Sequence, residues 1–529
     1  MYILIVAVVL LLALLAVKFS NRYGIPSFLL FIILGISFNF FGKDFNNYRF
    51  VDEFSSVALL IIMFYGGFGT NLKMAKPVTT QGVIMASAGV VLTSVLTGAF
   101  CYFVLKISIV ESMLLGSVVG STDFASVSSI LRSKNLNLKY STASMLEIES
   151  GSNDPTAYTM TMIFLSILMG SKTSVFKLIL LQVGIGLLVG FLMAKLTEKL
   201  IFKIDFSQDG LFTVLIISCA LLTFAISKNL GGNAFLSVYV LGIMIGNLEY
   251  YRKKEVVFFF DGFSGIMQIG LFFLLGLLAD PKSIVKAVPV AFLVMVFITI
   301  IARPLASILL LKPFGYKKNQ LIVISAAGFR GAAAIAFAIM VINSNAKLSV
   351  DLFHIIFVIC LLSCLIQGSL FPIICRKTDM IDPDDTVLKT FNYYSSKSDV
   401  GFIETKINEH SELVGKKVSE IGLHFDIIVA KIIRDNKLVV PRGDTVICAD
   451  DTVIIGGKSY FDPTGYGLVE ITISDKNNWN GKKLKDIDMI DSELVVMIQS
   501  KNGEIIVPSG NVTLNVGDKL IILKETVRL

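Results

Sequence analysis

The chain has 529 residues, of which 54% are hydrophobic and 16% charged, and its formal net charge is +7. A soluble domain carries roughly 25% charged residues, so this composition excludes an ordinary soluble enzyme. The apolar residues form repeated runs of about 17–25 residues, the length that crosses a hydrocarbon core of ~30 Å. The sequence therefore predicts a polytopic membrane protein in contact with lipid. Its basic residues fall mainly in short loops, which argues against a nucleic-acid partner.

About thirteen spans are predicted between residues 1 and 377, as apolar runs bounded by charges, Gly and Pro. They lie near 2–18, 25–41, 55–70, 78–105, 111–131, 143–168, 174–200, 209–227, 234–249, 256–279, 286–311, 319–344 and 351–375. Met1–Val17 has no basic n-region and no small-residue cleavage site, so it is predicted as the first span and not as a signal peptide.

The distribution of basic residues orients the predicted spans. Most Lys and Arg follow odd-numbered spans, for example Arg22, Lys76, Lys253 and Lys317. By the positive-inside rule these loops are cytoplasmic. We therefore expect a multi-pass protein of the plasma membrane with its N-terminus outside and its C-terminal part in the cytoplasm.

Two copies of one soluble unit are predicted after a linker at residues 378–400. Gly415–Ile421 resembles Gly481–Ile487, and Val440–Gly443 resembles Val507–Gly510. Alternating apolar residues and turn residues predict short strands in each copy, so the tail is expected to be α+β. The predicted domains are 1–377 in the membrane, 401–460, and a second, more divergent copy at 466–526.

The fifth span contains a polar stretch in Gly120-Ser-Thr-Asp-Phe-Ala-Ser126. These residues are poor helix-interior material, and they favour an unwound segment whose carbonyls face a cavity. Carbonyls, the Thr122 hydroxyl and the Asp123 carboxylate are oxygen ligands of the kind that an alkali cation requires.

The sixth span places Ser150, Asn153 and Asp154 on one helical face, at positions i, i+3 and i+4. An ionised carboxylate within the membrane is costly, and it marks a functional site by default. Asp154 is therefore predicted to hold a proton or a monovalent cation in alternation. Glu149 lies off this face and needs another partner.

Two arginines within spans are candidates for pairing with the buried acids. Arg330 lies in the twelfth span and Arg303 in the eleventh. Each would be costly without a partner, and Glu149 and Asp123 are both candidates. We expect Glu149–Arg330 as a structural ion pair and a separate role for Arg303 in stabilising the region where spans cross.

These motifs resemble a known family of transporters. Thr122-Asp123, Glu149-Ser-x-x-Asn153-Asp154-Pro155 and Gly328-Phe-Arg330-Gly occur in this order along the chain. They are similar to the cation:proton antiporter superfamily, in particular its NhaP-type, CvrA-like potassium/proton antiporters.

The resemblance implies an all-α membrane fold of about thirteen helices with inverted repeats, in which broken fifth and twelfth spans cross. It also implies a homodimer with a dimerisation domain and a mobile core that carries the ion by an elevator movement. The cation ligands that it implies are Asp154, Asn153, Ser150, Thr122 and Asp123. With one titratable carboxylate beside an amide, both this resemblance and the residues predict electroneutral exchange.

Two positions depart from the family pattern. The chain has Phe64-Tyr65-Gly66-Gly67 where such proteins often have an acid in the third span, so a role of that acid is not carried over. Phe124 replaces a proline that is common after Thr-Asp, which leaves the position of the break in the fifth span open.

The tail resembles the regulator-of-potassium-conductance C-terminal domain, also called RCK_C or TrkA-C. The resemblance is carried by Leu413–Val418, the strand Ile427–Arg434 and Val439–Asp444. It implies dimerisation and a cyclic di-AMP pocket involving Ile427, Ile428, Ala430 and Arg434. A constitutive dimerisation module without a ligand is the alternative. No G-x-G-x-x-G motif occurs, so nucleotide sensing through a Rossmann half is not expected.

Three functions remain to be compared. The first is an antiporter with no resident cofactor, exchanging K⁺ or Na⁺ for protons, with K⁺ favoured because of the attached tail. The second is a ligand-gated potassium channel or uptake subunit, but a Thr-Val-Gly-Tyr-Gly filter is missing from the sequence. The third is a membrane hydrolase, and the three His are too scattered for a catalytic or metal cluster. The antiporter, a transporter and not an enzyme, is the prediction.

Overall fold

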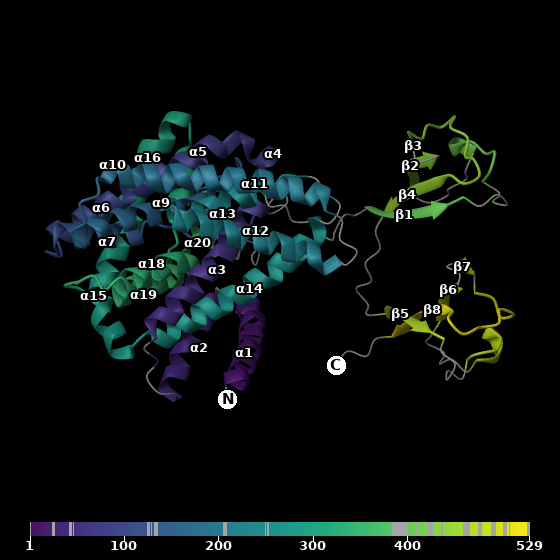
Figure 1. Ribbon diagram of the computed structural model, residues 1–529, viewed down its shortest axis with the longest axis horizontal. Helices are drawn as coiled ribbons and strands as arrows, with labels where there is room; N and C mark the ends of the chain where they lie inside the picture. The colour runs from purple at the N-terminus through teal and green to yellow at the C-terminus, as the bar shows by residue number, and fades with distance from the viewer. Residues whose placement is uncertain are drawn as a thin grey trace. The chain divides into compact units, whose positions relative to one another are not determined.

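The computed structural model contains a helical part, Met1–Tyr394, and a β-rich tail, Ser395–Leu529 (Figure 1). In the helical part the structure describes residues 2–23, 27–41, 45, 47–123, 127, 130–131, 136–204, 209–248, 250 and 253–382. In the tail it describes residues 400–407, 411, 413–420, 427–434, 437–458, 466–473, 479–487, 494–500, 505–506 and 508–525.

Helices make up nearly all of the described membrane part. In its first half they are α1 (Tyr2–Tyr23), α2 (Ser27–Phe41), α3 (Tyr48–Gly69), α4 (Leu72–Ala75), η1 (Lys76–Val78), α5 (Thr79–Ile84), η2 (Met85–Gly89), α6 (Val90–Phe103), α7 (Ile109–Val118), α9 (Thr142–Leu168), α10 (Val175–Ile179), η3 (Leu180–Ile185) and α11 (Gly186–Lys203). The second half contains α12 (Asp209–Asn229), α13 (Ala234–Gly246), α14 (Lys253–Leu278), α15 (Pro281–Phe297), η4 (Ile298–Ala302), α16 (Arg303–Leu311), η5 (Lys312–Phe314), α17 (Lys318–Ala326), α18 (Ala332–Asn343), α19 (Leu352–Leu362), η6 (Ser363–Gln367) and α20 (Gly368–Lys377).

Each of the predicted spans contains at least one of these helices. Among the described residues, seven helices are long and apolar enough to cross a membrane, and shorter apolar helices account for several of the other spans. The prediction of an all-α polytopic membrane fold is confirmed.

Two helices are interrupted in the middle of their spans, as predicted. α7 ends at Val118, and Ser121–Asp123 is not helical. In the twelfth span α17 ends at Ala326 and α18 begins at Ala332. The two breaks meet, because the Asp123 N–H donates to the Phe329 carbonyl at 2.8 Å. The predicted crossing of broken helices is confirmed, while Phe124 lies outside the described residues.

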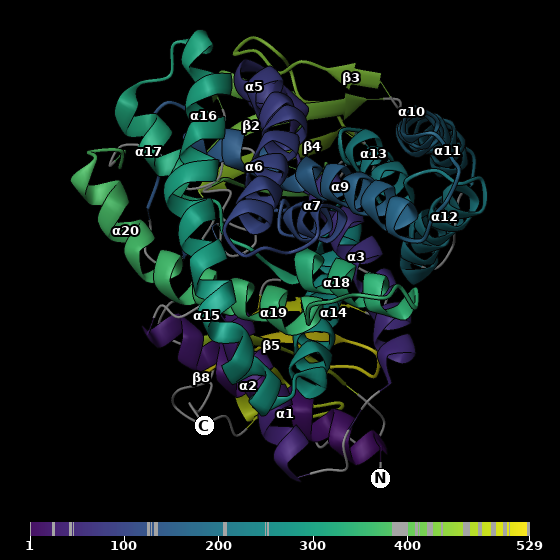
Figure 2. The ribbon, with the colours of Figure 1, turned by 90° about the vertical axis from the view of Figure 1, so that its left-hand side faces the viewer.

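Glycines allow the helices to approach one another closely. A Cβ at Gly276 of α14 would lie 2.3 Å from the Ile32 carbonyl of α2, and one at Gly246 of α13 would lie 2.0 Å from the Phe68 carbonyl of α3. α2, α3, α13 and α14 therefore pack as one group, and α11, α12 and α13 lie side by side (Figure 2).

A second group of helices surrounds the crossing. α7 packs against α6 and α9, and α15 packs against α19. A Cβ at Gly116 of α7 would lie 2.3 Å from the Ser94 carbonyl of α6, so these two helices are also in backbone contact.

The tail contains two four-stranded antiparallel sheets. The strands are β1 (Val400–Lys406), β2 (Ile427–Arg434), β3 (Lys437–Val439), β4 (Thr452–Lys458), β5 (Tyr466–Thr472), β6 (Leu494–Gln499), β7 (Ile505–Ile506) and β8 (Lys519–Glu525). The strand orders are β1-β4-β2-β3 and β5-β8-β6-β7. Both sheets have a register shift at the same place, between Val429 and Lys431 and between Val495 and Met497.

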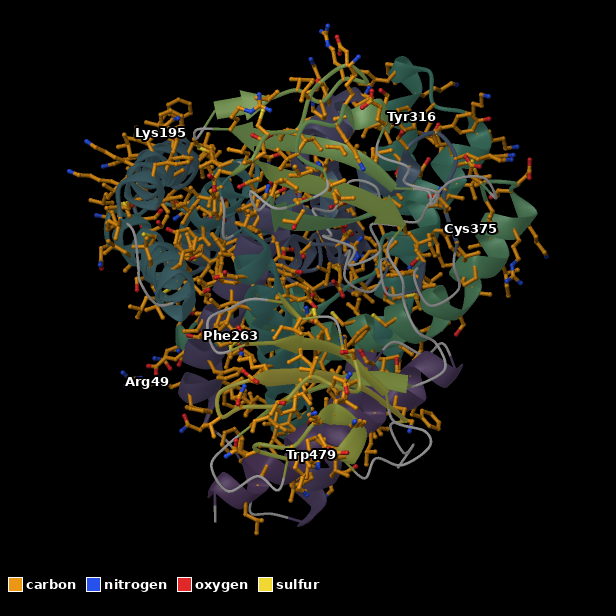
Figure 3. The ribbon with its side chains drawn as sticks, turned by 90° about the vertical axis from the view of Figure 1, so that its right-hand side faces the viewer. Arg49, Lys195, Phe263, Tyr316, Cys375 and Trp479 are labelled. Carbon is orange, nitrogen blue, oxygen red and sulfur yellow. The ribbon has the colours of Figure 1, made fainter. Side chains whose placement is uncertain are left out.

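The shared topology bears out the internal repeat. Each sheet has its own apolar core, and Trp479 packs against the core of the second sheet (Figure 3). The register pairs Ile433 with Thr452 and Gln499 with Lys519, so Arg434 of the first copy corresponds to Ser500 of the second.

Candidate ion-binding site

Asp154 faces the break in the fifth span. It lies in the middle of α9, directly before Pro155. The Ser121 hydroxyl, in the unwound stretch after α7, donates to Asp154 Oδ1. Ser121 is 1% exposed, so the contact lies in the protein interior. A helix and a broken helix together hold the carboxylate.

The other predicted ligands of the sixth span lie on the same face of α9. The Thr122 and Ser150 hydroxyl oxygens are 2.9 Å apart. Asn153 Nδ2 donates to the Thr122 carbonyl at 3.3 Å and also to the Thr122 hydroxyl. Asn153 Oδ1 is buried and has no hydrogen-bond partner among the described residues. This oxygen, the Asp154 carboxylate and two hydroxyls form a set of hard oxygen ligands, which suits an alkali cation.

Asp123 occupies a different position from these residues. Its side chain lies against Gly331, where an added Cβ would be 2.7 Å from Asp123 Oδ2. Gly331 is the N-cap residue of α18. A carboxylate beside a helix N-terminus interacts favourably with the N–H groups there. The structure thus places Asp123 at a helix end, close enough to Asp154 for the two charges to interact.

Arg330 binds the end of α7 from the opposite side of the crossing. Its Nη1 donates to the carbonyls of Gly120 and Ser121, each at 2.9 Å. The guanidinium therefore lies at the negative, C-terminal end of α7, while Asp123 lies at the positive end of α18. Each broken helix end is matched by the opposite charge, which stabilises unwound backbone inside the membrane.

The predicted Glu149–Arg330 pair is wrong. Glu149 Oε1 lies 2.5 Å from Arg303 Nη1, and the two side chains are 0% and 3% exposed. The freed carbonyls of Gly120 and Ser121 hold Arg330, whereas Glu149 points toward α16. Arg303 also borders the second break, because a Cβ at Gly328 would lie 3.0 Å from Arg303 Nε.

The sequence does not predict two of the side-chain contacts in the membrane part. The sequence predicts Ser121 as part of an unwound stretch and not as a partner of Asp154. Tyr65 of α3 donates to Asp261 Oδ1 of α14 at 3.0 Å. Asp261 lies inside the predicted tenth span, so the rule that intramembrane acids are functional candidates would have found it. Tyr65, which replaces the third-span acid of the family, therefore contacts a carboxylate of another helix.

In the tail, Arg434 forms a bidentate ion pair. Its Nε and Nη2 lie 2.7 and 2.8 Å from the two Asp451 oxygens, and Nη2 also donates to the Val446 carbonyl at 2.8 Å. Hydrogen bonds from Arg434 lower the pKa of Asp451, whose side chain is fully buried. Of the other predicted pocket residues, Ile428 is 66% exposed and Ala430 lies at the register shift. The side chain of Ile427 lies outside the described residues.

The sequence matches the family model of the sodium/hydrogen exchanger transmembrane domain over residues 6–377 and that of the TrkA-C domain over 402–459 and 468–525. The chain therefore belongs to the sodium/hydrogen exchanger family, whose members are cation/proton antiporters, and it carries a C-terminal TrkA-C pair.

Curated relatives share most of the chain. The K(+)/H(+) antiporter NhaP2 of Shewanella oneidensis is 30% identical over 457 residues, which is 83% of this chain and 78% of that protein. The K(+)/H(+) antiporter NhaP of Alkalimonas amylolytica is 29% identical over 86% of this chain and 80% of that protein. The sodium proton antiporter MjNhaP1 of Methanocaldococcus jannaschii matches with a TM-score of 0.62 at 21% identity, over 69% of this chain and 98% of its own, and so shares the fold.

Proposed function

We propose that this antiporter exchanges K⁺ for protons across the plasma membrane, with Asp154 as the group that binds either ion. The observation that carries the proposal is the cluster of Ser121, Thr122, Ser150, Asn153 and Asp154 at the crossing of two helix breaks. The Ser121 hydroxyl supports an ionised Asp154, and the unpartnered Asn153 Oδ1 adds a neutral ligand. Protonation of Asp154 removes the negative charge that a cation needs.

Exchange is proposed to be electroneutral. Asn153 cannot titrate, and Asp123 lies at the end of α18, so one carboxylate serves the cation cluster. One proton therefore replaces one monovalent cation. The Glu149–Arg303 pair is internally neutral, and it adds no net charge to the site.

An elevator movement fits the division of the helices into two groups. The cation cluster is built from α9 and the break after α7, which pack with α6, while α2, α3, α13 and α14 pack closely with one another and meet these helices at α9 and α18. The proposal is that α6, α7 and α9 carry the cluster across the membrane against the group formed by α2, α3, α13 and α14. We propose that the N-terminus lies outside and the tail in the cytoplasm, which the loop charges support. The group formed by α2, α3, α13 and α14 is proposed to form a homodimer interface.

The choice of K⁺ rests on the relatives named K(+)/H(+) antiporters. The alternative is Na⁺, which is favoured by the name of the family and of the MjNhaP1 structure. Everted vesicles from cells that lack other antiporters distinguish the two. The proposal predicts proton efflux after addition of K⁺ at concentrations where Na⁺ gives little, and an initial rate that an imposed membrane potential does not change. If only Na⁺ drives exchange, the transported cation is Na⁺ and not K⁺. A rate that depends on the membrane potential would contradict electroneutral exchange.

The TrkA-C pair is proposed to dimerise and to bind cyclic di-AMP as a regulator. Support comes from the family match of both copies and from the exposed apolar Ile428 on β2. Since Arg434 is held by Asp451, we place the ligand on the Ile428–Ala430 side of the strand, with Arg434 supporting the sheet. Titration of the full-length protein with cyclic di-AMP tests this. The absence of binding in the micromolar range would leave a constitutive dimerisation module.

A further inference from the structure

One face of the thirteenth span carries four polar or thiol side chains. Cys360, Ser363, Cys364 and Gln367 are spaced i, i+3, i+4 and i+7 along α19 and the π-helical turn η6. They are 3%, 0%, 1% and 7% exposed, respectively. In a span this spacing is typical of a packing face, and the thiols taken alone would be packing residues. Their contacts indicate a different role.

Three of these side chains bind the backbone of the break in the twelfth span. Ser363 Oγ accepts from the Arg330 N–H at 3.2 Å, and Cys364 Sγ donates to the Arg330 carbonyl at 3.2 Å. Cys360 Sγ donates to the carbonyl of the next residue, Gly331, at 3.4 Å. Unwound backbone inside a membrane cannot bond to bulk water, so these side chains replace the missing helical hydrogen bonds.

The direction of the hydrogen bonds is set by a chain that continues to the eleventh span. Thr299 Oγ1 donates to the Met295 carbonyl at 2.7 Å, and Gln367 Nε2 donates to the Thr299 hydroxyl. Ser363 Oγ in turn donates to Gln367 Oε1 at 2.7 Å. Because the Ser363 proton is committed to Gln367, its oxygen is available to accept from Arg330. Two π-helical turns, η4 and η6, supply Thr299 and Gln367.

We propose that Cys360, Ser363, Cys364 and Gln367 are positioning residues for cation binding. They fix the Arg330 peptide, and Arg330 in turn holds the Gly120 and Ser121 carbonyls. Ser121 then presents its hydroxyl to Asp154. The inference rests on the proposed cation site, and it assigns to the thirteenth span a part in that site although it contributes no ligand.

The test compares removal of a hydrogen-bonding group with its conservative replacement. The variants are Ser363→Ala against Ser363→Thr and Cys364→Ala against Cys364→Ser. Cys101→Ala is the matched control, because Cys101 is equally buried in α6. The apparent KM for K⁺ and the maximal exchange rate are measured in proteoliposomes, and thermal unfolding of the purified protein with and without K⁺ reports binding without transport.

Positioning predicts a rise of about two- to tenfold in the KM of Ser363→Ala and Cys364→Ala, the range for one neutral hydrogen bond. The KM values of Ser363→Thr, Cys364→Ser and the control Cys101→Ala are expected to stay within about twofold of the wild-type value. An unchanged KM in both alanine variants, with folded protein, would overturn the inference.

If Ser363→Ala fails to fold, the KM of Cys364→Ala tests the inference, because this variant removes only one weak hydrogen-bond donor. Failure of the proposed function has a separate signature. Wild-type protein would then show neither exchange nor stabilisation by K⁺, whatever residue stands at 363.

Discussion

At the scale of single residues, the proposed site consists of the Asp154 carboxylate with a shell of hydroxyl and amide groups. The shell explains why Asn153 and Asp154 differ in role although they are adjacent. Asn153 holds the unwound stretch through Thr122, and Asp154 is held by Ser121. If Asp154 binds the cation as proposed, the Ser121 hydroxyl stabilises the ionised carboxylate.

Replacing Ser121 by Ala is expected to raise the KM for K⁺ by about 10- to 100-fold, because a hydrogen bond to a charged group is worth ~1.5–3 kcal/mol. The measurement is K⁺-dependent proton flux in proteoliposomes. Ser117→Ala is the control, since the Ser117 hydroxyl returns to the Met113 carbonyl of its own helix. Equal KM values for the two variants would show that Ser121 does not contribute to cation binding.

The buried ion pair makes a second prediction at this scale. Removing one partner of a buried pair leaves an uncompensated charge and costs about 3–5 kcal/mol, whereas replacing both costs much less. We expect Glu149→Gln and Arg303→Gln each to lower the thermal stability of the purified protein, and the double variant to recover most of it. If thermal stability is recovered instead in the double variant Glu149→Gln/Arg330→Gln, the partner of Glu149 is Arg330, as the sequence predicts.

At the scale of elements, the sequence predicted the breaks but not the contacts between them. Gly116, Gly120 and the polar run after them mark an interruption because they oppose a helix locally. The choice between Arg303 and Arg330 as the partner of Glu149 depends on how the eleventh and twelfth spans pack beside α9, which no local pattern records. Ser121, Asp261 and the face at Cys360–Gln367 acquire their roles in the same way.

The close crossing of the two breaks depends on Gly331. A Cβ there would lie 2.4 Å from Asp123 Cβ, so Gly331→Ala is expected to separate the breaks and to abolish exchange while the protein still inserts into the membrane. The control is Gly262→Ala in α14, where nothing lies within 4 Å of the added Cβ. Exchange and membrane content are measured in the same vesicles. Full activity of Gly331→Ala would show that the crossing tolerates a side chain.

In the tail, Arg434 and Asp451 tie β2 to the turn before β4. Arg434→Gln leaves a buried carboxylate, and it is expected to destabilise the first copy by about 2 kcal/mol, less than a fully buried pair because Arg434 is partly exposed. Arg442→Gln, on an exposed turn, is the control. Urea unfolding of the 395–529 tail measures both.

The difference in unfolding stability between wild type and Arg434→Gln is expected to change with pH in one direction. The pKa of Asp451 is lowered by Arg434, so the stability it contributes is present above its ordinary pKa of about 4. This contribution is lost as the pH falls through the lowered value. The gap between wild type and Arg434→Gln should therefore be full at neutral pH and should narrow in acid. A gap that widens in acid would contradict the assignment.

At the scale of the whole molecule, hydropathy and repetition carried most of the prediction. Apolar runs gave the helices in order, and the shared segments of the tail gave two sheets of the same topology. Both signals are local in sequence, so they can be recognised without knowledge of how the helices and strands pack. The departure at Tyr65 is informative in retrospect, because its hydroxyl contacts Asp261 and a carboxylate is thus present near the third span after all.

Asp154 alone is proposed to exchange the proton for the cation. The direct measurement is proton flux in proteoliposomes driven by a K⁺ gradient, comparing wild type with Asp154→Asn and with Asp444→Asn, the same substitution on an exposed turn of the tail. We expect flux in wild type and in Asp444→Asn, and none above the protein-free background in Asp154→Asn. Flux in Asp154→Asn equal to that of wild type would contradict it.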